Sequence, residues 1–158
     1  MSFDDSTARP FLQSPAVEFM AEFSPDGNWI AYGSDASGGW EVYVQPYPGP
    51  GGVVRVSTDG GTEPLWAPSG QELFYRDLTG RHVYAVSVDI GSELQLGMPT
   101  LLFEGEFRSG GRYGRSYDVT PDGRRFLMLE QPPLPPNPTQ LIVVDGWFHE
   151  LERKFDSR

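Results

Sequence analysis

The sequence of 158 residues carries 22 acidic and 12 basic side chains, a formal net charge of −10, and no cysteine. The acidic balance argues against nucleic acid as a partner, and the absence of cysteine excludes disulfides, thiolate metal sites and a thiol nucleophile. With no apolar stretch near the roughly 18 residues of a membrane span and an acidic N-terminus unlike a signal peptide, we expect no membrane insertion and, if the chain is a complete protein, a cytoplasmic location.

A strand–turn–strand motif recurs three times, over residues 23–32, 66–75 and 119–128. Each copy has Pro, then Asp or Ser, then Gly, followed by an apolar run that favours a strand. The Gly is expected to supply the positive φ that a tight hairpin turn requires. The turn prolines stand at positions 25, 68 and 121, and a period of about 40–50 residues suits a unit of four short strands.

In chain order, residues 1–8 are expected to be a flexible N-terminus, and the apolar run 10–13 an isolated outer strand. Three units follow, at 17–57, 62–104 and 115–145. Their predicted strands are 17–24, 29–34, 40–45 and 53–57, then 63–67, 72–76, 83–88 and 100–103, then 116–120, 126–130 and 141–144. The segments 91–99 and 131–138 are expected to be loops, and residues 148–158 a tail or short helix.

The predicted fold is all-β: a β-propeller over residues 9–147 with about three four-stranded antiparallel blades per chain. Propellers close with roughly four to eight blades, and three blades in an open arc leave two sheet faces bare. We therefore predict a homodimer that closes a six-bladed ring about a two-fold axis. In that ring Pro10, Phe11, Leu12 and Gln13 of one chain complete the last blade of the other. The alternatives are an excerpt of a larger chain and half of a heteromeric ring.

A family resemblance supports this prediction. The run from Phe23 to Tyr32, followed by residues 41–44, resembles the repeat of TolB-like (WD-repeat-like) β-propellers, and the likeness covers residues 9–147. The stretch 41–129, with the ending 147–151, is most similar to the C-terminal propeller part of bacterial receptor-type serine/threonine kinases. In that family the propeller is a sensor or interaction module attached to a kinase domain, and the resemblance implies such a module here.

The first strand of each unit lines the channel of a propeller, so its residues are the first candidates for binding. Aligned on the turn prolines, Met20 matches Glu63 and Ser116, and Glu22 matches Leu65 and Asp118. We expect Met20, Glu22, Glu63 and Asp118 to line the channel. Their carboxylates, doubled in a dimer, would form an acidic funnel that favours cations or basic peptide segments, unless they are merely solvated loop acids.

A second candidate set is the group Arg108, Arg112, Tyr113 and Arg115 near a glycine-rich segment. Guanidinium groups suit carboxylate or phosphate ligands. The same group would also serve a dimer seam by meeting acids of the partner, and simple solvation of the charges is the third interpretation.

The sequence offers little that resembles catalytic chemistry. His82 and His149 are not at metal-ligand spacing, no Gly-x-Ser-x-Gly motif occurs, and we predict no metal site and no cofactor. The leading prediction is a non-catalytic binding or scaffold module whose partners are a second copy and a peptide or protein. The alternatives are a channel-centred, metal-dependent, lactonase-like hydrolase and a purely structural half-propeller without a ligand.

Overall fold

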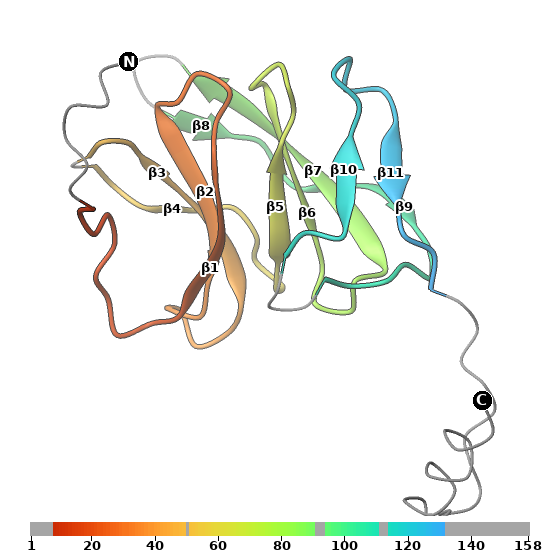
Figure 1. Cartoon of the computed structure of the whole chain (residues 1–158), viewed down its shortest axis with the longest axis horizontal. Helices are drawn as coiled ribbons and strands as arrows, with labels where there is room; N and C mark the ends of the chain where they lie inside the picture. The colour runs from red at the N-terminus through yellow and green to blue at the C-terminus, as the bar shows by residue number, and fades with distance from the viewer. Residues whose placement is uncertain (1–7, 50, 91–93, 111–113, 132–158) are drawn as a thin grey trace, which may run out of the picture.

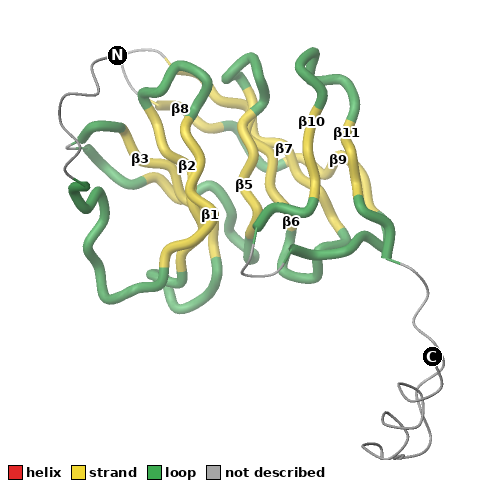
Figure 2. The backbone as a smooth tube through the Cα atoms, in the orientation of Figure 1, coloured by secondary structure: helices red, strands yellow, loops and turns green. Residues whose placement is uncertain are grey.

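The computed structural model describes residues 8–49, 51–90, 94–110 and 114–131. These residues contain no helix, and hence none that is long and apolar enough to cross a membrane. Their strands form antiparallel sheets, which confirms the all-β prediction (Figures 1 and 2). The first sheet has the order β1 (Glu18–Phe23), β2 (Trp29–Ser34), β3 (Glu41–Pro46) and β4 (Val54–Arg55).

The second sheet is larger and the third is smaller. In the second, β5 (Thr62–Trp66) pairs with β6 (Glu72–Arg76), and β6 with the long β7 (His82–Ile90). One end of β7 pairs with β9 (Thr100–Glu104) and the other with β8 (Leu94–Leu96). The third sheet consists of β10 (Tyr117–Val119) and β11 (Phe126–Met128).

Most strands fall where the sequence pattern predicts them, and β2 and β6 have the predicted bounds. Two predictions are corrected. The segment 91–99 contains β8, because β7 extends past its predicted end and offers Val88–Ile90 for a further pairing. Residues 10–13 form no strand in the single chain, where Phe11 and Leu12 pack on the first sheet instead. The strand predicted at 141–144 and the helix after residue 147 lie outside the described residues.

The repeated turns share one hydrogen-bonded geometry. The backbone N–H of Gly27 donates to the Ser24 carbonyl at 2.9 Å, and Gly70 and Gly123 donate in the same way to Ala67 and Thr120. The three glycines have φ of 74°, 72° and 70°. This left-handed region costs a glycine almost nothing, whereas a Cβ collides with the backbone there.

The sheets stack face to face, because successive side chains of each central strand point to opposite faces and both faces are apolar. The core between the first and second sheets consists of Ala31, Val42, Val44, Val56, Trp66, Leu73, Tyr75, Val86 and Val88. The core between the second and third sheets consists of Leu65, Ala67, Phe74, Ala85 and Tyr117, with Val119, Phe126 and Met128 beside it. The first strands β1, β5 and β10 thereby lie side by side, toward the viewer in Figure 1.

Replacing Gly27 by Ala tests the turn geometry. No atom lies within 4 Å of the position that the new Cβ would take, so the penalty is conformational alone. We expect the free energy of unfolding to fall by about 1 kcal/mol, measured by urea denaturation. The matched control is Gly39→Ala, which meets the same open space without a left-handed φ and is expected to leave stability unchanged. An equal loss in both variants would contradict the explanation.

Candidate functional site

An open groove of about 690 Å³ runs along the first strands of the three sheets. It is lined by Met20, Ala21, Glu22, Pro64, residues 114–118, Leu127 and Leu129. Three of the four predicted channel residues, Met20, Glu22 and Asp118, therefore share this groove, together with Arg115 from the arginine set. Glu63 does not line it.

Matching β-bulges shape the strands beside the groove. The pairing of β1 with β2 shifts between Phe19 and Glu22, and the pairing of β5 with β6 shifts between Thr62 and Leu65. Inside each bulge one non-glycine residue has a left-handed backbone, Met20 with φ 52° and Glu63 with φ 53°. Such residues are uncommon, and a bulge re-aims a side chain. The two bulges occupy the positions that the repeat alignment matched, although no local pattern in the sequence predicts a bulge at either position.

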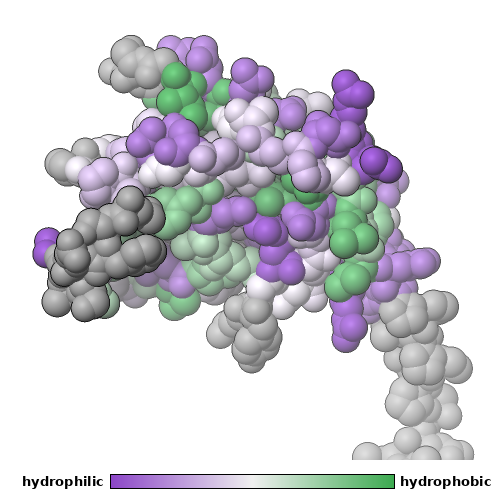
Figure 3. Space-filling view, turned by 45° about the horizontal axis from the view of Figure 1, so that its top comes forward, coloured by the Kyte–Doolittle hydropathy of each residue, from purple (hydrophilic) through white to green (hydrophobic). Residues whose placement is uncertain are grey.

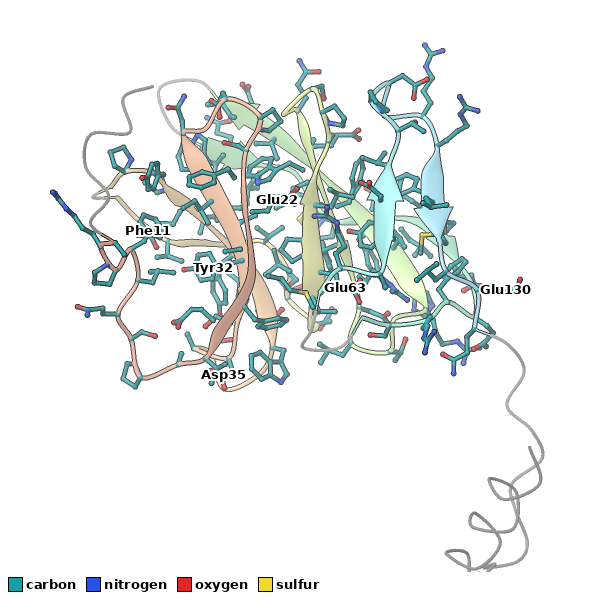
Figure 4. The ribbon with its side chains drawn as sticks, viewed as in Figure 1. Phe11, Glu22, Tyr32, Asp35, Glu63 and Glu130 are labelled. Carbon is teal, nitrogen blue, oxygen red and sulfur yellow. The ribbon has the colours of Figure 1, made fainter. Side chains whose placement is uncertain are left out.

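The expectation that Glu63 presents its carboxylate to the channel is corrected, because this side chain is fully buried. Its Oε1 lies 3.4 Å from Nη1 of Arg76, which is also fully buried. The backbone N–H and the hydroxyl of Ser116 both donate to Oε2 at 2.7 Å, and the Gly110 N–H donates to Oε1 at 3.1 Å. A buried carboxylate needs an opposite charge and several hydrogen-bond donors. Glu63 finds them between the second and third sheets (Figure 4).

Arg76 and Tyr117 extend this network between the second and third sheets. The Arg76 guanidinium donates to the carbonyl of Arg108 at 2.8 Å, to the carbonyl of Gly80 and to the Ser116 hydroxyl. The Tyr117 hydroxyl donates to the Glu63 carbonyl at 2.8 Å. Burial, together with the nearby Glu63 charge, raises the pKa of Tyr117 well above its ordinary value. The phenol therefore stays a hydrogen-bond donor at any ordinary pH.

The variant Glu63→Gln tests the contribution of this network to stability. The new amide NH₂ group would face the N–H and O–H donors that now bind the carboxylate. The loss of the negative charge would also leave the buried Arg76 guanidinium without its partner. We expect the free energy of unfolding to fall by about 3 kcal/mol. The matched control is Glu22→Gln, at an ion pair that is partly exposed to water, where we expect a change below about 1 kcal/mol. Urea denaturation of both variants is the measurement, and equal losses would contradict the assignment.

Glu22 bridges the groove to a residue far along the chain. Its Oε2 lies 2.9 Å from Nη1 of Arg115, and the two side chains are 28% and 30% exposed. The same oxygen accepts the Trp66 backbone N–H at 3.4 Å. Desolvation raises the pKa of Glu22 despite the opposing charge of Arg115, and the Asp118 charge adds to the rise. The predicted acidic funnel is thus modified: one acid is paired, one is buried, and Asp118 is exposed.

Of the two described members of the arginine set, Arg115 lines the groove and Arg108 does not. Nε of Arg115 donates to the Tyr117 carbonyl at 3.1 Å, and Nη1 donates to Glu22. Two of the three guanidinium nitrogens therefore bind groups of the same chain. Arg108 is exposed, and its backbone N–H donates to the Leu129 carbonyl at 2.7 Å. Arg112 and Tyr113 lie outside the described residues. A role of the set in anion binding or at a dimer seam stays a prediction.

His82 contacts two acidic side chains of the second sheet and its turn. Its Nδ1 lies 3.0 Å from the Asp77 carboxylate, and its Nε2 lies 3.4 Å from that of Glu104. In the part of the chain that the structure describes, no group of three or more His, Asp or Glu side chains is placed to hold a metal ion. His149 lies outside that part.

Comparison with known proteins adds no assignment to this site. No protein-family model matches the sequence, and no curated protein matches it.

Proposed function

We propose that this chain is a non-catalytic binding and scaffold module: half of a TolB-like β-propeller that a second copy closes into a six-bladed ring. The observation that carries the proposal is the shared groove, bordered by the first strands of three stacked antiparallel sheets. In a closed ring of such sheets these strands surround the central channel. The groove of each half would then become part of that channel.

The repeat register supports closure by a further sheet. Ala31, Phe74 and Leu127 occupy the same place in the three repeats. The first two are 0% and 2% exposed, because each packs into the core shared with the following sheet. Leu127 is 68% exposed and Leu129 is 52% exposed, and Figure 3 shows an apolar patch on the surface at this end of the stack. A contact surface of this kind favours a partner sheet.

The mass in solution tests the ring. Size-exclusion chromatography with light scattering is expected to give twice the 17.6 kDa of one chain. The variant Leu127→Asp is expected to shift the protein to the single-chain mass, because a carboxylate in the contact would lose its water. Met98→Asp, at an exposed residue of the connection between β8 and β9, is the control and should stay dimeric. A folded monomer of 17.6 kDa for the unmodified chain would refute the ring.

The ligand that the groove favours is an extended segment with basic and apolar side chains. Asp118 is exposed at the groove, and Glu22 is partly open to it. A guanidinium or ammonium group of a ligand would compete with Arg115 for Glu22 while meeting Asp118. Met20 and Ala21 give the same groove an apolar portion.

A labelled peptide of alternating Arg and Leu, followed by fluorescence anisotropy, tests this ligand class. The double variant Glu22→Gln with Asp118→Asn is expected to weaken binding about fivefold or more, in keeping with the loss of charge-assisted contacts. The control is Glu72→Gln, an exposed residue on the turn side of the second sheet. Equal affinity for the unmodified chain and the double variant would contradict the assignment, as would equal binding of an Asp–Leu peptide.

The pH dependence of this binding follows from Glu22. Since desolvation raises its pKa, its charge is lost at a higher pH than that of a free glutamate. We expect peptide affinity to fall on mild acidification, before ordinary carboxyls titrate. In Glu22→Gln this early fall should vanish, whereas in Asp118→Asn it should remain. Anisotropy titrations across mildly acidic pH measure the difference.

A further inference from the structure

We propose that Phe11 and Leu12 form a strap that masks the ring-closing face of the first sheet, and that a second copy displaces the strap when the ring forms. This inference rests on the proposed ring and names the face through which the partner docks. The docking partner is the outward face of β10 and β11 of the second copy, which carries Leu127.

The masked face is identified by the repeat register. Ile30 matches Leu73 and Phe126, and Tyr32 matches Tyr75. In the second and third sheets these positions pack toward the preceding sheet, Leu73 and Tyr75 against the first sheet and Phe126 against the second. The outward face of the first sheet therefore has the side-chain pattern of a face that receives a preceding sheet, although no sheet precedes it among the described residues.

The strap fills that position in the single chain. Ile30, Tyr32 and Tyr43 form a buried cluster, and Phe11 and Leu12 pack against it. Figure 4 shows Phe11 on the side of Tyr32 that faces away from the second sheet. The rings of Tyr32 and Tyr43 stack with centroids 5.9 Å apart. Without a cover, these side chains would be open to water at the end of the stack.

Contacts at both ends hold the strap in place. The Phe11 ring lies 5.5 Å from that of Tyr47, between centroids, and the Tyr47 ring lies 4.9 Å from that of Phe23. At the other end, the Val17 backbone N–H donates to the Asp35 carboxylate at 2.9 Å. The segment between these contacts forms no strand, so it contributes no ladder hydrogen bonds and is held by side chains.

The two ends of the stack therefore differ. At the first sheet two side chains of the strap cover the apolar face, whereas at the third sheet Leu127 and Leu129 are exposed. A whole sheet buries more apolar area than two side chains do, so it stabilises the face more. The strap is thus a replaceable cover that lowers the apparent affinity between copies, because only the uncovered state binds. Displacement would also free residues 10–13 for the pairing with the partner that the sequence predicts.

The double variant Phe11→Ala with Leu12→Ala tests the strap in the full-length chain. It removes the covering side chains but leaves the backbone able to pair as a strand. Sedimentation velocity over a concentration series is expected to give a dimer dissociation constant about tenfold lower than that of the unmodified chain. The control, Val17→Ala, changes an exposed residue beside the strap and should leave association unchanged. Unchanged or weaker association in the double variant would overturn the proposal if the unmodified chain dimerises.

A second readout separates the strap from the ring. If neither the unmodified chain nor the variant associates, the ring fails, and the strap is then judged by binding of the apolar dye ANS to the monomer. The double variant should bind clearly more dye than the unmodified chain and Val17→Ala, because the Ile30–Tyr32–Tyr43 face is uncovered. Equal dye binding in non-associating monomers would overturn the strap.

Discussion

The buried ion pair between Glu63 and Arg76 is the constraint on which the groove depends. Two charges buried between apolar sheets are tolerated only when each is paired with the other and hydrogen-bonded to further groups. Here the partners come from the third sheet and the connection before it, including Ser116, Gly110 and the carbonyl of Arg108. The pair therefore fixes where β10 lies relative to β5, and with it the positions of Arg115 and Asp118.

A second ion pair, between Glu22 and Arg115, lies in the groove itself and has a different physical character. Both side chains retain access to water, so their attraction is screened and either group remains available to a competitor. A buried pair that positions a strand, beside a partly exposed pair that a ligand can open, is an arrangement suited to recognition.

The ends of the stack pose a problem that every open array of sheets shares. Each internal face is covered by the next sheet, but the first and last faces have no neighbouring sheet among the described residues. The strap residues Phe11 and Leu12 cover the outer face of the first sheet, whereas Leu127 is exposed on the outer face of the third. This asymmetry connects the stability of the single chain to its proposed assembly. The apolar face of the first sheet stabilises the single chain by packing on the strap, and it would stabilise the ring by packing on a partner sheet.

The sequence by itself determined the all-β class, most of the strands and the repeated turns, because alternation of side chains and the backbone freedom of Gly27, Gly70 and Gly123 are local properties. It also grouped Met20, Glu22 and Asp118 at one edge through the repeat register. Only the tertiary structure decided that Glu63 is buried against Arg76 and that Glu22 meets Arg115, 93 residues away. It likewise placed Phe11 on the first sheet. These outcomes depend on which sheet faces pack against each other, and the local pattern of residues along the chain does not determine that packing.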